Sequence, residues 1–162
     1  MSDAFPNIPP PPHLGGCLCG AARYKLEARP RAINACHCMD CKKLSGASHI
    51  LMLIADTDSF LHERGEVERY RKRADSGREV DIVRCTRCGV RMWHEPVASP
   101  EFRFVAAGTL DDPQWAAPTS HIWLQSISPG VLISPETLLV DAQPENRQML
   151  IAAFEGIHGV QK

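Results

Sequence analysis

The residues of this chain best suited to chemistry are its seven cysteines, which occur in three short groups. They are Cys17 and Cys19; Cys36, Cys38 and Cys41; and Cys85 and Cys88. Closely spaced cysteines of this kind are typical zinc ligands. Their number is odd, which argues against a framework built only from disulfides, and reduced thiols are usual in the cytosol. The sequence therefore predicts a cytoplasmic metalloprotein.

Counting divides the cysteines into two candidate sites. In CLC the extended backbone projects both side chains to one side, and in CTRC the two cysteines straddle a tight turn. Gly20 and Gly89 follow these pairs, so backbone amides can approach the sulfurs. The two pairs match as halves of a closed four-cysteine site, the usual pattern of structural zinc. The remaining three cysteines resemble a catalytic site, which keeps one position open.

Other assignments of the three remaining cysteines stay open at this stage. A histidine from elsewhere would close the site, and the candidates are His37, His49, His94 and His121. His37 lies between two of the cysteines, so an extended backbone would point it away from the metal. A second structural zinc and an iron–sulfur cluster are the further alternatives. Moving a cysteine from the other pairs would leave those pairs with too few ligands.

The elements that must position these cysteines are mostly strands. In AARYKLEA at 21–28, Ala22, Tyr24 and Leu26 alternate with charged residues, as in a half-buried strand. Further segments of strand character lie at 49–56, 67–72, 80–85, 90–95, 102–107 and 121–127. One turn of helix is expected after Cys38. The fold class predicted is mainly β.

A second helix is predicted near the carboxyl end. In PENRQMLIAAFEGI at 144–157, Leu150, Phe154 and Ile157 recur at helical spacing, with Pro144 near the start. We expect a proline-rich tail over 1–13, a zinc-binding domain over 14–142, and this short helix within 143–162, packed on the domain or extending it.

Composition limits the classes of partner. The 162 residues carry a net charge of −1, with an isoelectric point near 6.6, which gives no case for nucleic acid or an anionic membrane. No apolar stretch approaches the roughly 18 residues needed to span a bilayer. The first residues are acidic and rich in proline, unlike a signal or transit peptide. The oligomeric state stays unpredicted.

Five segments together resemble the glutathione-dependent formaldehyde-activating enzyme family, which also includes centromere protein V-like domains. They occur in the family order and cover residues 14 to about 128. They are GGCLCGAARY at 15–24, CHCMDCKKLSG at 36–46, RCTRCGVRMW at 84–93, GTLDDP at 108–113 and HIW at 121–123. The chain departs from the family pattern at Arg84, where an aromatic residue is common, and at SPGV, where a Pro-Trp pair is common.

The resemblance implies a β-tent fold of antiparallel sheets built around a four-cysteine zinc site. It implies a structural zinc on the two cysteine pairs and a catalytic zinc on Cys36, Cys38 and Cys41. The implied reaction is carbon–sulfur bond formation or cleavage: the thiol of glutathione adds to formaldehyde and gives S-(hydroxymethyl)glutathione. The implied partners are thus a small thiol and an aldehyde. The alternatives are a lyase for another thiol adduct and a non-catalytic zinc-binding interaction module.

Four further residues are candidates for the reaction. A glutathione-like substrate has two carboxylates and needs cationic partners, for which Lys42, Lys43 and Arg23 lie next to the ligand segments. His121 is the candidate for acid–base work. Ordinary solvation at the surface is the alternative for the three cations. Asp111 in GTLDDP is expected to form a turn, together with the aspartate that follows it.

Overall fold

The computed structural model describes residues 5–74 and 77–159. Residues 1–4 of the predicted tail and 160–162 of the predicted helical segment lie outside the described residues. In the described part of the chain, no helix combines the length and the apolar character that crossing a bilayer requires.

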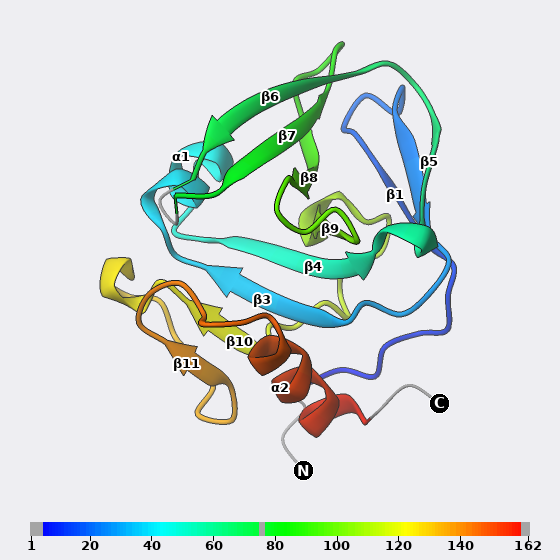
Figure 1. The fold of residues 1–162 in the computed structure, drawn as a ribbon. Helices are drawn as coiled ribbons and strands as arrows, with labels where there is room; N and C mark the ends of the chain where they lie inside the picture. Colours follow the sequence, from blue (N-terminus) through cyan, green and yellow to red (C-terminus); the bar gives the residue numbers. More distant parts are fainter. Residues whose placement is uncertain (1–4, 75–76, 160–162) are drawn as a thin grey trace.

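The strands form two sheets (Figure 1). The small sheet has the order β1–β2–β5, with β1 at His13–Gly16, β2 at Arg23–Leu26 and β5 at Phe60–Arg64. The large sheet has the order β11–β10–β3–β4–β9–β8–β7–β6. Its strands are β3 Ala32–Cys36, β4 Ile50–Asp56, β6 Val67–Arg73, β7 Glu79–Cys85, β8 Arg91–Pro96, β9 Phe102–Ala106, β10 Ser120–Ile122 and β11 Leu138–Val140. The helices are α1 Met39–Ser45 and α2 Gln148–His158, with 3₁₀ turns η1 Thr57–Ser59, η2 Ala107–Thr109 and η3 Leu124–Ser126.

The mainly β class and the terminal helix are confirmed, and the predicted sheets need one correction. The large sheet is mixed, because β10 runs parallel to both β3 and β11. Parallel neighbours require a long connection, and β10 reaches β11 through residues 123–137. The segment predicted as a strand over 121–127 thus ends early and continues as η3. The helix predicted after Cys38 is also longer than one turn.

The two sheets pack through an aromatic core. Ala22, Tyr24 and Leu26 are fully buried, as their alternation predicted. The Tyr24 ring lies 5.5 Å from that of Phe60 and 6.0 Å from that of Trp93, measured between centroids. Trp93 belongs to β8, so this face of the large sheet packs on the small sheet. Side chains alternate along a strand, so the residues next to Trp93 face the other side.

Helix α2 covers part of that other side. It contacts β3 and β10 and lies beneath β3 in Figure 1. Leu150, Ile151 and Phe154 bury its apolar side. At its carboxyl end, Arg29 Nη2 donates to the carbonyl of His158 at 3.1 Å, and such contacts satisfy the last carbonyls of a helix. The helix is therefore held at both its apolar side and its end.

Candidate functional site

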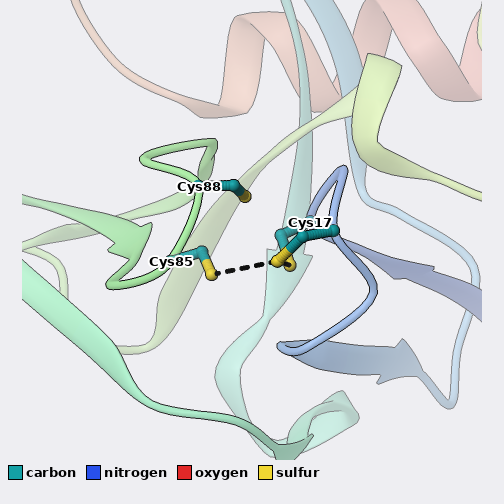
Figure 2. Close-up of side chains that lie close together, drawn as sticks. Cys17, Cys85 and Cys88 are labelled. Carbon is teal, nitrogen blue, oxygen red and sulfur yellow. Dashed lines mark hydrogen bonds between the residues drawn. The ribbon is translucent and has the colours of Figure 1, made fainter.

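Two turns bring four cysteines together between the sheets. We call this the four-cysteine cluster: Cys17, Cys19, Cys85 and Cys88. The first pair lies in the turn between β1 and β2, and the second in the turn between β7 and β8 (Figure 2). Gly20 and Gly89 have φ angles of 73° and 72°, a left-handed conformation that glycine adopts without strain. The pairs predicted as halves of one site are thus adjacent.

The spacing of these sulfurs fits zinc. All four Sγ atoms lie within 4.8 Å of one another. Cys19 Sγ lies 3.5 Å from Cys17 Sγ and 3.9 Å from Cys85 Sγ. A tetrahedral site with Zn–S bonds of about 2.3 Å separates its sulfurs by about 3.8 Å. Burial favours the neutral Cys17 thiol, but hydrogen bonds from the Ala22 amide and the neighbouring thiols outweigh it and lower the pKa to about 6. The cluster therefore suits a thiolate-bound metal.

A second group of thiols lies where β3 ends and α1 begins. We call it the three-cysteine cluster: Cys36, Cys38 and Cys41. Their Sγ atoms also lie within 4.8 Å of one another, and no histidine or carboxylate of the described residues joins the group. Cys38 precedes α1, and its Sγ accepts a hydrogen bond from the Cys41 amide at 3.4 Å. Three ligands and an open position result.

Hydrogen bonding concentrates negative charge on one sulfur of this cluster. Bonds from the Cys36 and Cys41 thiols hold the pKa of Cys38 far below its ordinary value. The same bond to Cys38 raises the pKa of Cys36, and bonds to Cys36 and Cys38 raise that of Cys41. A bound zinc ion would displace the protons that these thiols carry.

A cavity of about 500 Å³ adjoins the three-cysteine cluster, and we call it the cysteine cavity. Its floor is the face of the large sheet opposite Trp93. The strand residues on this floor are Asn34, Cys36, Met52, Ile54, Val80, His94, Pro96, Phe104 and Ile122. Trp123, whose φ of 62° is unusual for a residue other than glycine, lines one side. Residues 143–147 and Leu150 form another wall.

His94 is a functional candidate that the sequence suggested only as a metal ligand. It lines the cysteine cavity and is 8% exposed. Burial lowers its pKa to about 3, so the ring is neutral. Arg91 Nη1 lies 3.2 Å from His94 Nε2, and because arginine only donates, the ring proton is on Nδ1. The alternation around Trp93 already assigned His94 to the opposite face.

Arg91 is a second residue that the sequence did not single out. Burial lowers the pKa of its guanidinium, and a coulombic interaction with Cys41 raises it, so the two residues lie within electrostatic range of each other. A zinc ion with three thiolates carries a net charge of −1. Arg91 is positioned to offset that charge.

His121 lies on the other side of the sheet from this cavity. It is 4% exposed, and its Nδ1 lies 3.0 Å from Nε2 of the fully buried His37. Neither histidine lines the cysteine cavity. On β3, His121 pairs with Ala35, whereas the next residue of β10, Ile122, pairs with Cys36. The acid–base role of His121 stays a prediction without a direct contact to the cavity.

The three predicted cations also lie outside the cavity lining. Arg23 makes a two-pronged ion pair with Asp111, with Nη1 donating to Oδ1 at 2.8 Å. Lys42 donates to the carbonyl of Ser126, and Lys43 is exposed. Their roles in substrate binding stay predictions, and the structure gives Arg23 and Lys42 other partners.

One of the solved structures that resemble this chain is a crystal structure of a Rhodobacter sphaeroides protein, a structural genomics target. It aligns with a TM-score of 0.48 and 17% sequence identity. The alignment covers 78% of this chain and 98% of that chain.

The family comparison covers both cysteine clusters. Residues 12–126 match the family described as "Glutathione-dependent formaldehyde-activating enzyme". This stretch contains all seven cysteines and both clusters. The chain belongs to the glutathione-dependent formaldehyde-activating enzyme family.

Proposed function

We propose that the chain is a zinc-dependent carbon–sulfur lyase or synthase acting on adducts of a thiol and an aldehyde, with S-(hydroxymethyl)glutathione as the type compound. One observation carries the proposal. Three thiols with no fourth ligand from the described residues line a cavity large enough for a small molecule. Family membership supports the same chemistry.

The reaction is an addition and needs no oxidant or reductant. The sulfur of the thiol forms a bond to the carbonyl carbon of formaldehyde, the carbonyl π bond breaks, and the thiol proton ends on the oxygen. The reverse reaction breaks the carbon–sulfur bond and returns thiol and aldehyde. Zinc in the three-cysteine cluster would lower the pKa of a bound thiol and so supply the nucleophile, while its three thiolates leave it a weak Lewis acid.

The residues around the cluster have separate roles in this proposal. Cys36, Cys38 and Cys41 hold the metal. Arg91 offsets the negative charge of the metal and its ligands, and His94 provides a neutral ring with a proton on Nδ1. Met52, Ile54, Phe104 and Ile122 give the cavity floor an apolar surface beside the cluster.

The test uses one cysteine from each cluster, since every cysteine of the chain belongs to a cluster. Cys38→Ser is expected to reduce zinc from two ions per chain to one, to leave the melting temperature close to that of the wild type, and to abolish the acceleration of adduct exchange. NMR exchange spectroscopy of glutathione and formaldehyde measures that rate above the uncatalysed background. Cys88→Ser is the matched control, and it is expected to lower the melting temperature strongly.

The outcomes separate the alternatives. Full acceleration by the Cys38→Ser protein with one zinc per chain would remove the three-cysteine cluster from the chemistry. Acceleration with another thiol but not with glutathione would favour a lyase for a different adduct. No acceleration by the two-zinc wild type with any thiol would favour the non-catalytic zinc-binding module.

A further inference from the structure

The cysteine cavity has a charged end with one wall built by residues outside the family match. Its lining residues 143–147 and Leu150 all follow residue 126, where the match ends. Arg147, which immediately precedes α2, and Arg78, in the turn between β6 and β7, both line it. Burial lowers the pKa of Arg147, the charge of Glu101 raises it by a smaller amount, and repulsion from Arg78 lowers it by less again. Two guanidinium groups and the carboxylates of Glu79 and Glu145 therefore make this end of the cavity charged.

Aromatic rings fix the position of Arg147. Its guanidinium carbon lies 4.6 Å from the centroid of Phe102 and 5.1 Å from that of Phe104. Contacts of this kind hold the face of a guanidinium and leave the N–H donors at its edge available. Phe104 itself lines the cavity floor. The donors of Arg147 are thus held beside the cavity.

Arg147 forms no ion pair among the described residues: the charge of Glu101 favours its guanidinium, but no salt bridge includes Arg147. Glu79 and Glu145 also line the cavity but form no ion pair with it in the described part of the chain. The rings of Phe102 and Phe104 cover the face of this half-buried guanidinium, but no carboxylate of the described residues is within ion-pair distance of the donors at its edge. A ligand carboxylate would restore those contacts by a two-pronged hydrogen bond.

The register gives the distance between the two ends of the cavity. Cys36 pairs with Ile50, and Phe104 pairs with Ile54, four residues along β4. Together with two strand spacings, this puts the Cα atoms of Cys36 and Phe104 about 16 Å apart. Side chains reach inward from both ends, so a ligand touching both spans on the order of 10 Å, about three extended residues.

We propose that Arg147 is the specificity-determining residue of the cysteine cavity and binds a carboxylate that the thiol substrate carries far from its sulfur. The inference rests on the proposed function only for the thiol end of the ligand. In this proposal the substrate carboxylate binds Arg147 instead of Lys42, Lys43 or Arg23, the cations that lie next to the cysteines in sequence. Selection of the thiol then depends on a segment outside the family match.

The test measures binding without thiol chemistry. S-methylglutathione keeps both carboxylates and cannot form a thiolate, and its diethyl ester lacks both negative charges. Calorimetric titration of the two-zinc protein with each probe is compared for the wild type, Arg147→Gln and Arg147→Lys. Arg64→Gln is the matched control, because Arg64 is exposed on the small sheet.

Arg147→Gln is expected to weaken S-methylglutathione binding by about tenfold or more, because a charge-assisted bond is lost. The Arg147→Lys protein should bind with intermediate affinity, since it keeps the charge and loses the fork. The ester should bind equally to the wild type and Arg147→Gln, and Arg64→Gln should match the wild type. Zinc content and melting temperature establish that each variant is folded; if the Gln variant fails to fold, Arg147→Lys decides alone.

Three results would overturn the inference: unchanged affinity in both variants, an equal loss for both probes, or no binding of S-methylglutathione to the wild type. Failure of the proposed function gives a different pattern. Binding would then depend on Arg147 while no thiol–aldehyde exchange is accelerated. If exchange is accelerated but binding of S-methylglutathione does not depend on Arg147, the proposed function stands and the carboxylate contact of Arg147 is refuted.

Discussion

Replacing Phe154 by alanine is expected to loosen α2 from the sheet and to destabilise the whole domain. The ring is 2% exposed, with the Arg29 guanidinium 4.9 Å above it and the His158 ring 4.8 Å away. Removing a buried phenylalanine side chain costs about 3–5 kcal/mol, a large part of the roughly 5–15 kcal/mol that holds a typical domain folded.

This loss of unfolding free energy corresponds to a lower melting temperature. A chain of this size loses about 2–4 °C per kcal/mol, so Phe154→Ala should melt roughly 6–20 °C below the wild type. Circular dichroism measures the transition. Zinc content should stay at two per chain, because both clusters lie on strands, turns and α1. Leu132→Ala is the control: Leu132 is 94% exposed, and its removal should cost less than about 0.5 kcal/mol.

Two results would refute the reasoning about α2. A loss below about 2 °C with zinc retained would mean that α2 contributes nothing to the domain. Loss of zinc from the folded Phe154→Ala protein would mean that the clusters depend on the helix. A loss of melting temperature below about 2 °C would also argue against residues 143–147, which precede α2, as a stable wall of the cysteine cavity.

Three further perturbations follow from the described contacts. Glu95 accepts hydrogen bonds from Arg69 and Trp93; burial raises its pKa, but these bonds outweigh it and lower the pKa overall. Glu95→Gln should therefore cost about 1–2 kcal/mol in urea unfolding at pH 7. The difference should shrink as the pH falls from the ordinary glutamate pKa through the lowered pKa of the folded protein, where the wild-type carboxylate becomes protonated. Gly65→Ala should lower the free energy of unfolding by at least about 2 kcal/mol, because φ is 91° and an added Cβ would lie 2.3 Å from a backbone oxygen of the β1–β2 turn. Gly130→Ala is the control and should cost less, since φ is 83° there but an added Cβ would meet no atom within 4 Å. A chelator should remove zinc in two phases, measured by a colorimetric indicator. The first phase should empty the three-cysteine cluster without unfolding, and the second should empty the four-cysteine cluster with loss of the circular dichroism signal. Simultaneous release of both ions would contradict the separation of the two sites.

Local patterns predicted the parts of the fold that depend on near neighbours in sequence. The spacing of Cys17 and Cys19 is set by one strand end, and the alternation of Ala22, Tyr24 and Leu26 by one strand. Dividing the cysteines into two sites required only that a structural zinc site have four ligands. The terminal helix followed from its own apolar spacing. Each of these signals is contained in a few consecutive residues.

Distant pairings were not predictable in the same way. The parallel pairing of β10 with β3 joins residues more than 80 positions apart. Arg147 reaches the cavity only because α2 docks on β3, and no pattern around it differs from a solvated helix start. The sequence suggests His94 only as a candidate metal ligand, and its place in the cavity lining depends on what packs against each side of the sheet. Adjacency in sequence instead favoured Lys42 and Arg23, which the fold pairs elsewhere.

The two cysteine clusters share no ligand, and this has a consequence for oxidative damage. Oxidants attack accessible thiolates: the three-cysteine cluster is reached through the cysteine cavity, whereas Cys19 of the four-cysteine cluster is itself exposed. A disulfide in the three-cysteine cluster would prevent metal binding there and leave the four-cysteine cluster joining the two sheets. A disulfide at Cys19 would instead weaken that junction, so the position of the damage decides whether the fold survives.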